Sequence, residues 1–592
     1  MRYVDELTGA LKTQLALAYR TKDLLAYGLR RALREGYSRA DFRADARASV
    51  TVGLVAIPMS IALATAVDVP PQYGLYTAII AGVLCALLGG TRTQVTGPTA
   101  AMIVVVLPVV HRFGVAGVLL AGMMGGVILA VMGLARMGRL LQFIPHPVTA
   151  GFTTGVAVVI SLTQLRDLLG IAVSRSDSTL DYVHALVLRL GETSGWEVGA
   201  GALTLALLIG IPRLTQRVPA TAVALLVVSA AVALLHHWLP GANIATIGSS
   251  FSSTVDGQVI RGVPPLPPMP LLPWNLRGGL SLDYALFREL LPSAFAIATL
   301  GAIESLTSAM VSDGMTGSKH DPNSELIALG IANIVCPFFG GIAATGALAG
   351  TATNIKAGAR SPIAAMLQGG FILACTIVLA PLLGYLPMAA LAALLMLVAK
   401  NLAELRHFAR LFRIGQRSDV LVMLTCFALT VAFDMVLAVT VGVVLAAMLF
   451  MRRMAVLTKV VLDTRSTSSY DLPPGVRLYV VAGPLFFGAA KSAMAALHSA
   501  GGGGGTLILS MEHVPTIDAT GLVAVESVLD HLLRSKTKVI LSGLQPEIAD
   551  LLDRAGIKRI PGKLAIAPDV ETAISMAIVH SAQLQSEPRT AA

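Results

Sequence analysis

Apolar residues dominate the chain between about residues 48 and 454, where hydrophobic stretches follow one another with short polar interruptions. A helix needs about 20 apolar residues to cross the hydrocarbon core of a membrane. Two stretches, 98–110 and 346–355, are shorter, and each begins at glycine and other small residues. The pattern also predicts twelve longer helices, at 48–67, 72–89, 115–135, 147–169, 196–212, 218–236, 286–312, 324–341, 361–382, 386–400, 418–433 and 435–451. The chain therefore carries fourteen predicted membrane segments.

The two short segments occupy matching places, third among the first seven segments and third among the second seven. Short segments at corresponding positions of two halves are typical of transporters built from repeats, and they point to the substrate site. Because each half holds an odd number of segments, the second half must be inverted relative to the first. The N-termini of two such half-helices face the middle of the membrane, where each offers about half a positive charge and free N–H groups. This arrangement favours an anionic substrate.

After residue 454 the pattern changes to short strands that alternate with amphipathic helices. We expect strands at 476–481, 506–510 and 538–541 and helices at 489–499, 521–534, 545–555 and 570–577. Such alternation predicts an α/β domain with a central sheet. The predicted organisation is a cytoplasmic N-terminal region (1–47), a transmembrane domain (48–454), a linker (455–475), a soluble domain (476–580) and a flexible tail (581–592).

Composition supports a polytopic membrane protein. Of 592 residues, 55% are hydrophobic and only 13% are charged, whereas soluble proteins carry about 25% charged residues. The formal charge is +10, and the Lys and Arg residues gather in the loops assigned to the inside, thirteen against six outside. This bias predicts that both termini are cytoplasmic. No basic stretch is interleaved with aromatic residues, which argues against nucleic acid as a partner. The four cysteines lie in apolar runs without metal-ligand spacing.

Several fragments carry a resemblance to a known family. They are PPQYGLYTAIIAGVLCALLGG at 70–90, GPTAAMIVVV at 97–106, IESLTSAMVSDGMTGSKHDPNSELIALGIANI, FFGGIAATGALAGTATNIKAGARSP and, in the soluble part, LILSMEHVPTIDATGLVAVESVLDHL. The chain resembles the SulP (sulfate permease) anion transporters, whose cytosolic module is a STAS domain. The second half and the GPLFFGAA stretch look most like bacterial C4-dicarboxylic acid transporters of the DauA type.

The resemblance implies a polytopic α-helical fold, a 7+7 UraA-like inverted repeat with core and gate domains, and a homodimer in the bacterial inner membrane. It implies transport. No nucleophile–base pair, metal-ligand cluster or Gly-rich nucleotide loop stands out in the sequence, so we expect no cofactor, no metal and no enzyme activity. Carried over residue by residue, it places the anion between segments three and ten, flanked by segments one and eight. The implied substrate-binding residues are Pro58, Met59, Ser60, Gly97, Pro98, Thr99, Ala100, Ala101, Thr345, Gly346 and Ala347.

Glu304 and Ser308, in the eighth segment, are the predicted proton or cation coupling residues. A carboxylate within an apolar span is costly and usually functional. The alternative is a carboxylate that only bonds to a neighbouring helix. Sodium-coupled relatives carry a hydroxyl on segment ten where this chain has Leu348, so protons are the expected coupling ion. Many relatives also carry an arginine where this chain has Gly350, which puts the affinity for the anion and the substrate charge in question.

For most of the other polar residues we expect structural roles, and for one of them a regulatory role. The charged residues between segments eight and nine are expected to form a solvated loop with helix caps; they are Asp313, Lys319, His320, Asp321 and Glu325. Asn333 and Asn354 are expected to brace helices through hydrogen bonds. Thr520 resembles the phosphorylated position of bacterial STAS regulators, although a threonine there also serves as an N-cap.

The sequence thus predicts a secondary transporter that moves a C4-dicarboxylate such as succinate or fumarate together with protons, by an elevator-like movement. Two alternatives remain open. One keeps the fold and replaces the substrate with sulfate or bicarbonate. The other is a membrane sensor that signals through the STAS domain to a cytosolic partner.

Overall fold

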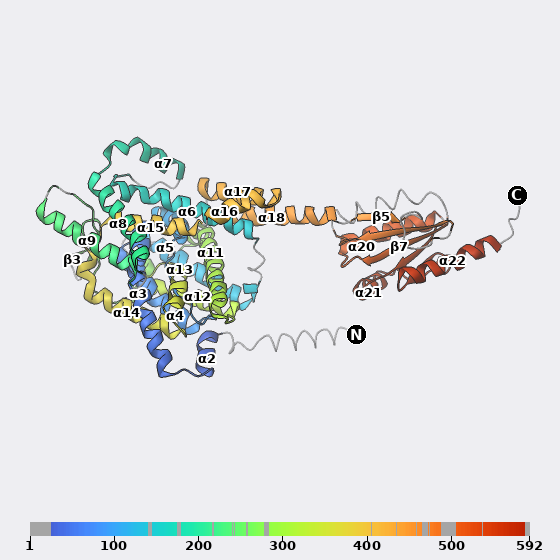
Figure 1. Ribbon diagram of the computed structural model, residues 1–592, viewed down its shortest axis with the longest axis horizontal. Helices are drawn as coiled ribbons and strands as arrows, with labels where there is room; N and C mark the ends of the chain where they lie inside the picture. The colour runs from blue at the N-terminus through green and yellow to red at the C-terminus, as the bar shows by residue number, and fades with distance from the viewer. Residues whose placement is uncertain are drawn as a thin grey trace. The chain divides into compact units, whose positions relative to one another are not determined.

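The computed structural model describes the following residues: 25–139, 145–173, 179–215, 218–239, 241, 243–255, 258–276, 283–403, 405–433, 435–457, 459–463, 472, 474–486, 505–535 and 537–586. The chain divides into two compact units, one up to Val443 and one from Val444. The first unit is helical, and the second is built on a sheet (Figure 1).

Each of the fourteen predicted segments corresponds to a described helix or part of one. The helices are α3 (Arg39–Ala66), α4 (Pro71–Leu88), α5 (Met102–Leu134), α6 (His146–Leu169), α8 (Gly195–Leu214), α9 (Ala220–Trp238), α11 (Tyr284–Thr316), α12 (Pro322–Val335), α13 (Leu348–Lys356), α14 (Ile363–Leu383), α15 (Met388–Leu402), α17 (Arg417–Ala432) and α18 (Met435–Leu457). Helix α5 contains two predicted segments, separated where Gly114 has a φ of 66° that favours glycine. Ten helical stretches in the described ranges are long and apolar enough to cross a membrane.

The structure adds short elements that the hydropathy pattern does not predict. They are α2 (Tyr27–Arg34), α7 (Thr179–Leu188), α10 (Ile247–Ser250), α16 (Leu405–Ile414), the strands β2 (Ser252–Val255) and β3 (Gln258–Arg261), and two 3₁₀ turns, η3 (Leu190–Glu192) and η4 (Pro273–Asn275). A third 3₁₀ turn, η5 (Cys336–Phe339), follows α12 directly and falls within the predicted segment 324–341. Helix α3 also begins earlier than predicted. Ser38 and Asp41 form a capping box there, because each side chain accepts the backbone N–H of the other. Hydropathy detects only the apolar part of such a helix.

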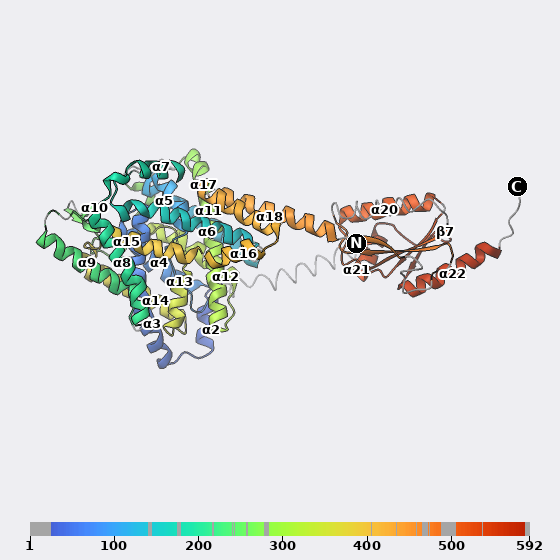
Figure 2. The same ribbon diagram turned by 45° about the horizontal axis from the view of Figure 1, so that its top comes forward.

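The helices of the first unit pack in two groups. In the first group α5 packs against α11 and α12, α14 packs against α3 and α4, and α13 packs against α11 and α3. In the second group α6 packs against α15 and α17, and α8 packs against α9 and α15. Helices α8 and α9 lie on the opposite side of the unit from α11 and α12 (Figures 1 and 2). Glycines let α5 and α12 approach closely, since a Cβ on Gly126 would lie 2.7 Å from the carbonyl oxygen of Gly330.

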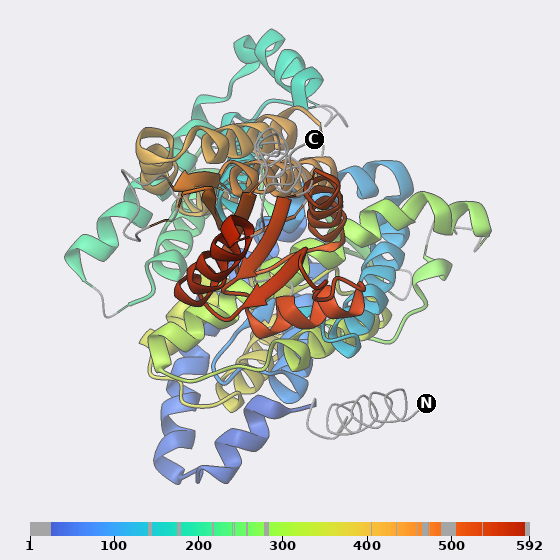
Figure 3. The ribbon, with the colours of Figure 1, turned by 90° about the vertical axis from the view of Figure 1, so that its right-hand side faces the viewer.

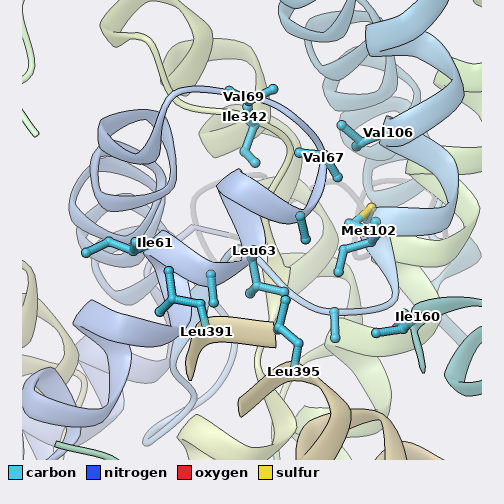
Figure 4. Packing of buried hydrophobic residues seen from close by; sticks show 14 of the residues in the cluster. Ile61, Leu63, Val67, Val69, Met102, Val106, Ile160, Ile342, Leu391 and Leu395 are labelled. Carbon is cyan, nitrogen blue, oxygen red and sulfur yellow. The ribbon is translucent and has the colours of Figure 1, made fainter. Parts of the chain in front are cut away.

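Helix α3 contributes to both groups, because it also packs against α15. Ile61 and Leu63 of α3 are at most 2% exposed, and Leu63 lies next to Leu391 and Leu395 of α15 in one apolar cluster (Figure 4). The same cluster includes Met102, from the start of α5. The region around the start of α5 is therefore packed from both helix groups.

The second unit has a sheet in the order β5-β6-β7-β8-β9, with β5 (Lys459–Asp463), β6 (Val476–Ala482), β7 (Gly505–His513), β8 (Thr537–Ser542) and β9 (Leu564–Ala567). Only the β5–β6 pair is antiparallel. Leu507 and Leu509 of β7 pack with α20 (Ala519–Arg534) and α21 (Pro546–Arg554), whereas Ile508 packs with α22 (Val570–Ser586) on the other face (Figure 3). The predicted α/β organisation is confirmed, β5 and β9 were not predicted, and the predicted helix 489–499 lies outside the described residues.

Candidate substrate site

Two short strands join the two predicted half-helices at their starts. β1 (Thr96–Gly97) precedes α5, and β4 (Thr345–Gly346) precedes α13. They pair antiparallel, with Thr96 opposite Gly346 and Gly97 opposite Thr345. The antiparallel pairing is the local consequence of two halves that run in opposite directions.

The half-helices that follow the crossing of β1 and β4 (residues 96–97 and 345–346) are both too short to span a membrane. Helix α13 has nine residues, which corresponds to about 14 Å at the rise of an α-helix. The first part of α5 ends at Gly114, after Met102. The first N–H groups of a helix have no partner within the helix, and together with the helix dipole they favour an anion at that end. The crossing therefore joins two potential anion-binding helix ends.

Glu304 lies beside the crossing, on the long helix α11. Its Oε2 accepts a hydrogen bond of 2.7 Å from Oγ1 of Thr99, at the start of the first half-helix. Both side chains are half-buried, whereas Ile303 and Ser305 on either side of Glu304 are buried. The carboxylate thus sits at the edge of the packed core.

Ser308 lies one helical turn further along α11 and contacts the second half-helix. Its Oγ is 2.9 Å from Oγ1 of Thr351, which also accepts the N–H of Val95 at 3.0 Å. Ser308 and Thr351 are both fully buried. The predicted coupling residue Ser308 therefore joins α11, α13 and the residues before β1, and its hydroxyl is part of the packed interior in this conformation.

The other predicted binding residues divide by exposure. Met59, Thr99 and Ala347 are half-buried, whereas the remaining ones are buried: Pro58, Ser60, Gly97, Pro98, Ala100, Ala101, Thr345 and Gly346. The hydroxyl of Thr345 is already used, since it donates to the carbonyl oxygen of Gly301 at 3.0 Å. Met59, Thr99, Ala347 and Glu304 are therefore the predicted residues best placed to meet a ligand.

The second half-helix presents an apolar surface next to these residues. Leu348 is 46% exposed and Gly350 is half-buried. A Cβ on Gly350 would lie 3.3 Å from Cγ1 of Val95, a close contact that a small shift relieves. Position 350, where the resemblance led us to expect arginine, is therefore half-buried, and glycine leaves it without a side chain.

Glu325 was expected in a solvated loop, and this prediction is wrong. This residue is 1% exposed, in the first turn of α12, and its carboxylate accepts hydrogen bonds from Gly90, Thr91, Gln94 and Ser305. Its sequence neighbours are charged and polar, so local composition suggested exposure. The expected helix cap is confirmed at Asp321, whose Oδ1 accepts the N–H of Ser324 at 2.7 Å.

Two asparagines brace the same crossing, as predicted. The Asn333 side chain donates to the Ala344 carbonyl oxygen at 2.9 Å and accepts the Ala344 N–H at 2.8 Å. The Asn354 amide donates to the carbonyl oxygen of Thr93 at 2.9 Å. Each bond connects a helix to one of the two stretches that lead into the half-helices, which fixes the backbone around the crossing.

In the second unit, Thr520 is exposed near the start of α20. The alternative role as an N-cap is wrong, because Asp518 is the N-cap and its Oδ1 accepts the N–H of Gly521 at 2.7 Å. The hydroxyl of Thr520 is thus not the cap of this helix.

Comparison with known proteins identifies the family of each part of the chain. Residues 42–426 match the sulfate permease family, and residues 469–573 match the STAS domain. The chain belongs to the sulfate permease family. It is 36% identical over 532 residues to a Bacillus subtilis (strain 168) protein named "Putative sulfate transporter YvdB", and the match covers 89% of this chain and 96% of that protein. It is 27% identical over 544 residues to the bicarbonate transporter BicA of Picosynechococcus (strain PCC 7002), covering 88% and 92%.

The fold is also shared with solved structures. The structure of SLC26A9 superposes with a TM-score of 0.81 at 17% identity, over 99% of this chain and 97% of that chain. The predicted fold class, a UraA-like helical membrane domain with a C-terminal α/β STAS domain, is therefore confirmed. As a member of the sulfate permease family, the protein is a multi-pass membrane transporter of anions.

Proposed function

We propose that this sulfate permease family member is a secondary transporter that moves a small anion together with protons. The two half-helix ends would hold the anion, and Glu304 would carry the proton. The hydrogen bond between Thr99 and Glu304 is the observation that carries the proposal, because it connects the start of one half-helix to a titratable group at an accessible position.

The charge on Glu304 would change the affinity of the half-helix ends for an anion. An ionised Glu304 would oppose an anion at the same helix ends, whereas a protonated Glu304 would leave their partial positive charge available. Binding of an anion and of a proton would therefore favour each other, and such mutual coupling is what a symporter requires. In a site that lacks an arginine at position 350, this coupling would matter more than in relatives that carry one.

For the substrate we propose a C4-dicarboxylate such as succinate or fumarate, on the strength of the sequence resemblance. Sulfate and bicarbonate are the rival substrates, because relatives with those names match most of the chain. We propose an elevator-like movement in which the group of α5, α11, α12 and α13 carries the anion past the group of α6, α8, α15 and α17. A homodimer in the bacterial inner membrane, with cytoplasmic termini and Thr520 as a regulatory phosphosite, completes the proposal.

Uptake of labelled succinate into proteoliposomes, with and without an inward proton gradient, tests the proposal. We expect gradient-driven uptake that unlabelled fumarate inhibits. Flux of sulfate or bicarbonate without flux of succinate would show that one of those anions is the substrate. Absence of flux with all three anions would favour the sensor alternative.

The variant Glu304→Gln tests the proton carrier, because an amide keeps the size of the side chain and does not titrate near neutral pH. We expect the variant to bind the anion still, but a proton gradient should no longer accelerate its uptake of the anion. Glu197→Gln is the matched control. Glu197 is a buried glutamate on α8, and its Oε1 accepts the N–H of Ala245 at 2.6 Å. Gradient-driven uptake that persists in Glu304→Gln would contradict the role of Glu304.

A further inference from the structure

Glu325 makes a dense set of contacts that the proposed transport cycle does not use. Its Oε2 accepts the N–H of Gly90 at 2.9 Å, and the N–H and the hydroxyl of Thr91 at 3.1 and 3.0 Å. Its Oε1 accepts Nε2 of Gln94 at 2.9 Å and Oγ of Ser305 at 3.3 Å. All five contacts are donated to the carboxylate, so a fully satisfied group of this kind holds its neighbours in one arrangement.

Gln94 connects Glu325 to the crossing of β1 and β4 through hydrogen bonds and packing. Its Nε2 donates to Glu325 and also to Oγ of Ser305 at 2.8 Å. Because a carboxylate only accepts hydrogen bonds, the nitrogen of Gln94 must face Glu325. The same nitrogen lies against Gly346 of β4, so closely that a Cβ on Gly346 would overlap it. Gln94 therefore fills the space beside the strand that leads into α13.

The residue after Gln94 connects both half-helices. The N–H of Val95 donates to Oγ1 of Thr351 in α13 at 3.0 Å. The carbonyl oxygen of Val95 accepts the N–H of Ala347 at 2.8 Å. The next residues, Thr96–Gly97, are β1, which leads into α5. A displacement of Gln94 would thus move the starts of both half-helices, and Thr99, at the first of them, is hydrogen-bonded to Glu304.

We propose that Glu325 is a positioning residue for anion transport, which acts through Gln94 to hold the two half-helix ends at the spacing that the anion requires. This inference rests on the proposed function. Glu325 would not touch the anion, and its effect on transport would arise through the backbone of residues 94–97 and 345–347.

The variant Glu325→Gln is the direct test, made in the full chain reconstituted in proteoliposomes. The introduced amide has the same size, but its nitrogen must face either the backbone donors at Gly90 and Thr91 or the amide of Gln94. We expect the KM for the transported anion to rise by about tenfold, which corresponds to one buried donor left unpaired. Ser305→Ala, which removes one donor and leaves the carboxylate, is expected to raise it less.

The double variant Glu325→Gln with Gln94→Glu provides a rescue that a purely structural role would not predict for KM. It exchanges the acceptor and the donor between the two positions: the amide oxygen at position 325 can still accept from Gly90 and Thr91, and the amide nitrogen can donate to the carboxylate at position 94. We expect the KM to return to within about threefold of the wild type, since the contacts are restored. Glu197→Gln, the buried glutamate of α8, is the matched control and should leave the KM unchanged.

Hydrogen exchange separates this inference from the proposed function, because it needs no flux. We expect the amides of Val95 and Ala347 to exchange faster in Glu325→Gln and to recover in the double variant. If the wild type moves no anion, the proposed function fails, and unchanged exchange would independently overturn the positioning role. An unfolding temperature that falls in Glu325→Gln while the KM and the exchange of both amides stay constant would also overturn it.

Discussion

Two glutamates near the crossing of the half-helices have opposite surroundings. Glu304, on α11, is half-buried and has one described side-chain donor, the hydroxyl of Thr99. Glu325, on α12, is 1% exposed and accepts five hydrogen bonds. Both lie within apolar helices, and Ser305, next to Glu304, is itself a donor to Glu325. The two carboxylates thus belong to neighbouring parts of one interior.

This difference separates a group that can change its charge from a group that fixes a structure. A carboxylate with five donors loses several contacts when it is protonated or replaced, and each buried donor left unpaired costs about 1–3 kcal/mol. A half-buried carboxylate with one donor loses little, because water replaces the missing partner. The burial and the number of donors therefore tell more about the role of an intramembrane glutamate than its mere presence in an apolar segment.

The largest loss of stability is expected when a methyl group is added at Gly346, which lies on the Glu325 side of the crossing. A Cβ on Gly346 would overlap Gln94 Nε2 and would lie 2.9 Å from Cα of Ser305. A Cβ on Gly97, the paired strand, would meet only Ala78, at 3.8 Å. We expect Gly346→Ala to lower the free energy of unfolding by about 3 kcal/mol, at the upper end for overpacking, whereas Gly97→Ala should change it by less than about 1 kcal/mol.

Thermal unfolding of the purified variants in detergent, followed by intrinsic fluorescence, measures this contrast. The two glycines lie in neighbouring positions of the β1–β4 pair, Gly346 opposite Thr96 and Gly97 opposite Thr345, and both are buried, so they share strand context. Equal losses of stability in the two variants would show that the Gln94 side of the crossing is no more rigid than the other side.

Much of the fold was accessible from the sequence because hydropathy follows directly from burial in lipid. The order of the fourteen segments and the two short ones needed only the apolar pattern and the length that a membrane demands. What the pattern missed was short or polar, such as α2, the amphipathic α16 and the polar start of α3 at Arg39. These elements are polar or amphipathic, so a search for long apolar runs does not detect them.

The candidate site was accessible only in part. Glu304 stands out because it is a lone charge in a long apolar run. Glu325 follows Lys319, His320 and Asp321 in the sequence, so only the folded chain shows that its side chain turns inward. Gln94 and Thr351 give no sequence signal of their own, because their importance comes from partners more than 200 residues away in the chain. Long-range pairing of this kind cannot be derived from local composition.

A smaller loss of unfolding free energy is expected when Thr99, the one described side-chain donor to Glu304, is replaced. Thr99→Val keeps the shape of the side chain and removes the hydrogen bond to Glu304. We expect a loss of less than about 1 kcal/mol in unfolding free energy, because water can replace the hydroxyl at a half-buried position. Thr345→Val is the matched variant, since Thr345 is fully buried and donates to Gly301. It should cost about 1–2 kcal/mol, and a larger loss in Thr99→Val than in Thr345→Val would contradict the comparison.

The smallest change in unfolding temperature is expected from replacing Glu35, a third glutamate that is exposed. Its Oε1 accepts Nε of Arg31 at 2.8 Å, and its Oε2 accepts a hydrogen bond from Arg92. These two arginines lower the pKa of Glu35 below its usual value. Since the pKa is lower in the folded chain, its contribution to stability is present above about pH 4, the unfolded value, and is lost as the pH falls through the folded value.

Glu35→Gln should therefore leave the unfolding temperature at pH 7 within about 1 °C of the wild type, because exposed ion pairs are screened by water and salt. Any small difference should vanish when the same measurement is repeated well below pH 4, where Glu35 is protonated. A loss of several degrees at pH 7 would mean that a charge with two arginine partners at the surface stabilises the chain as much as the buried Glu325. It would then be the charged partners, and not burial with a full set of donors, that distinguish a structural glutamate from a titrating one.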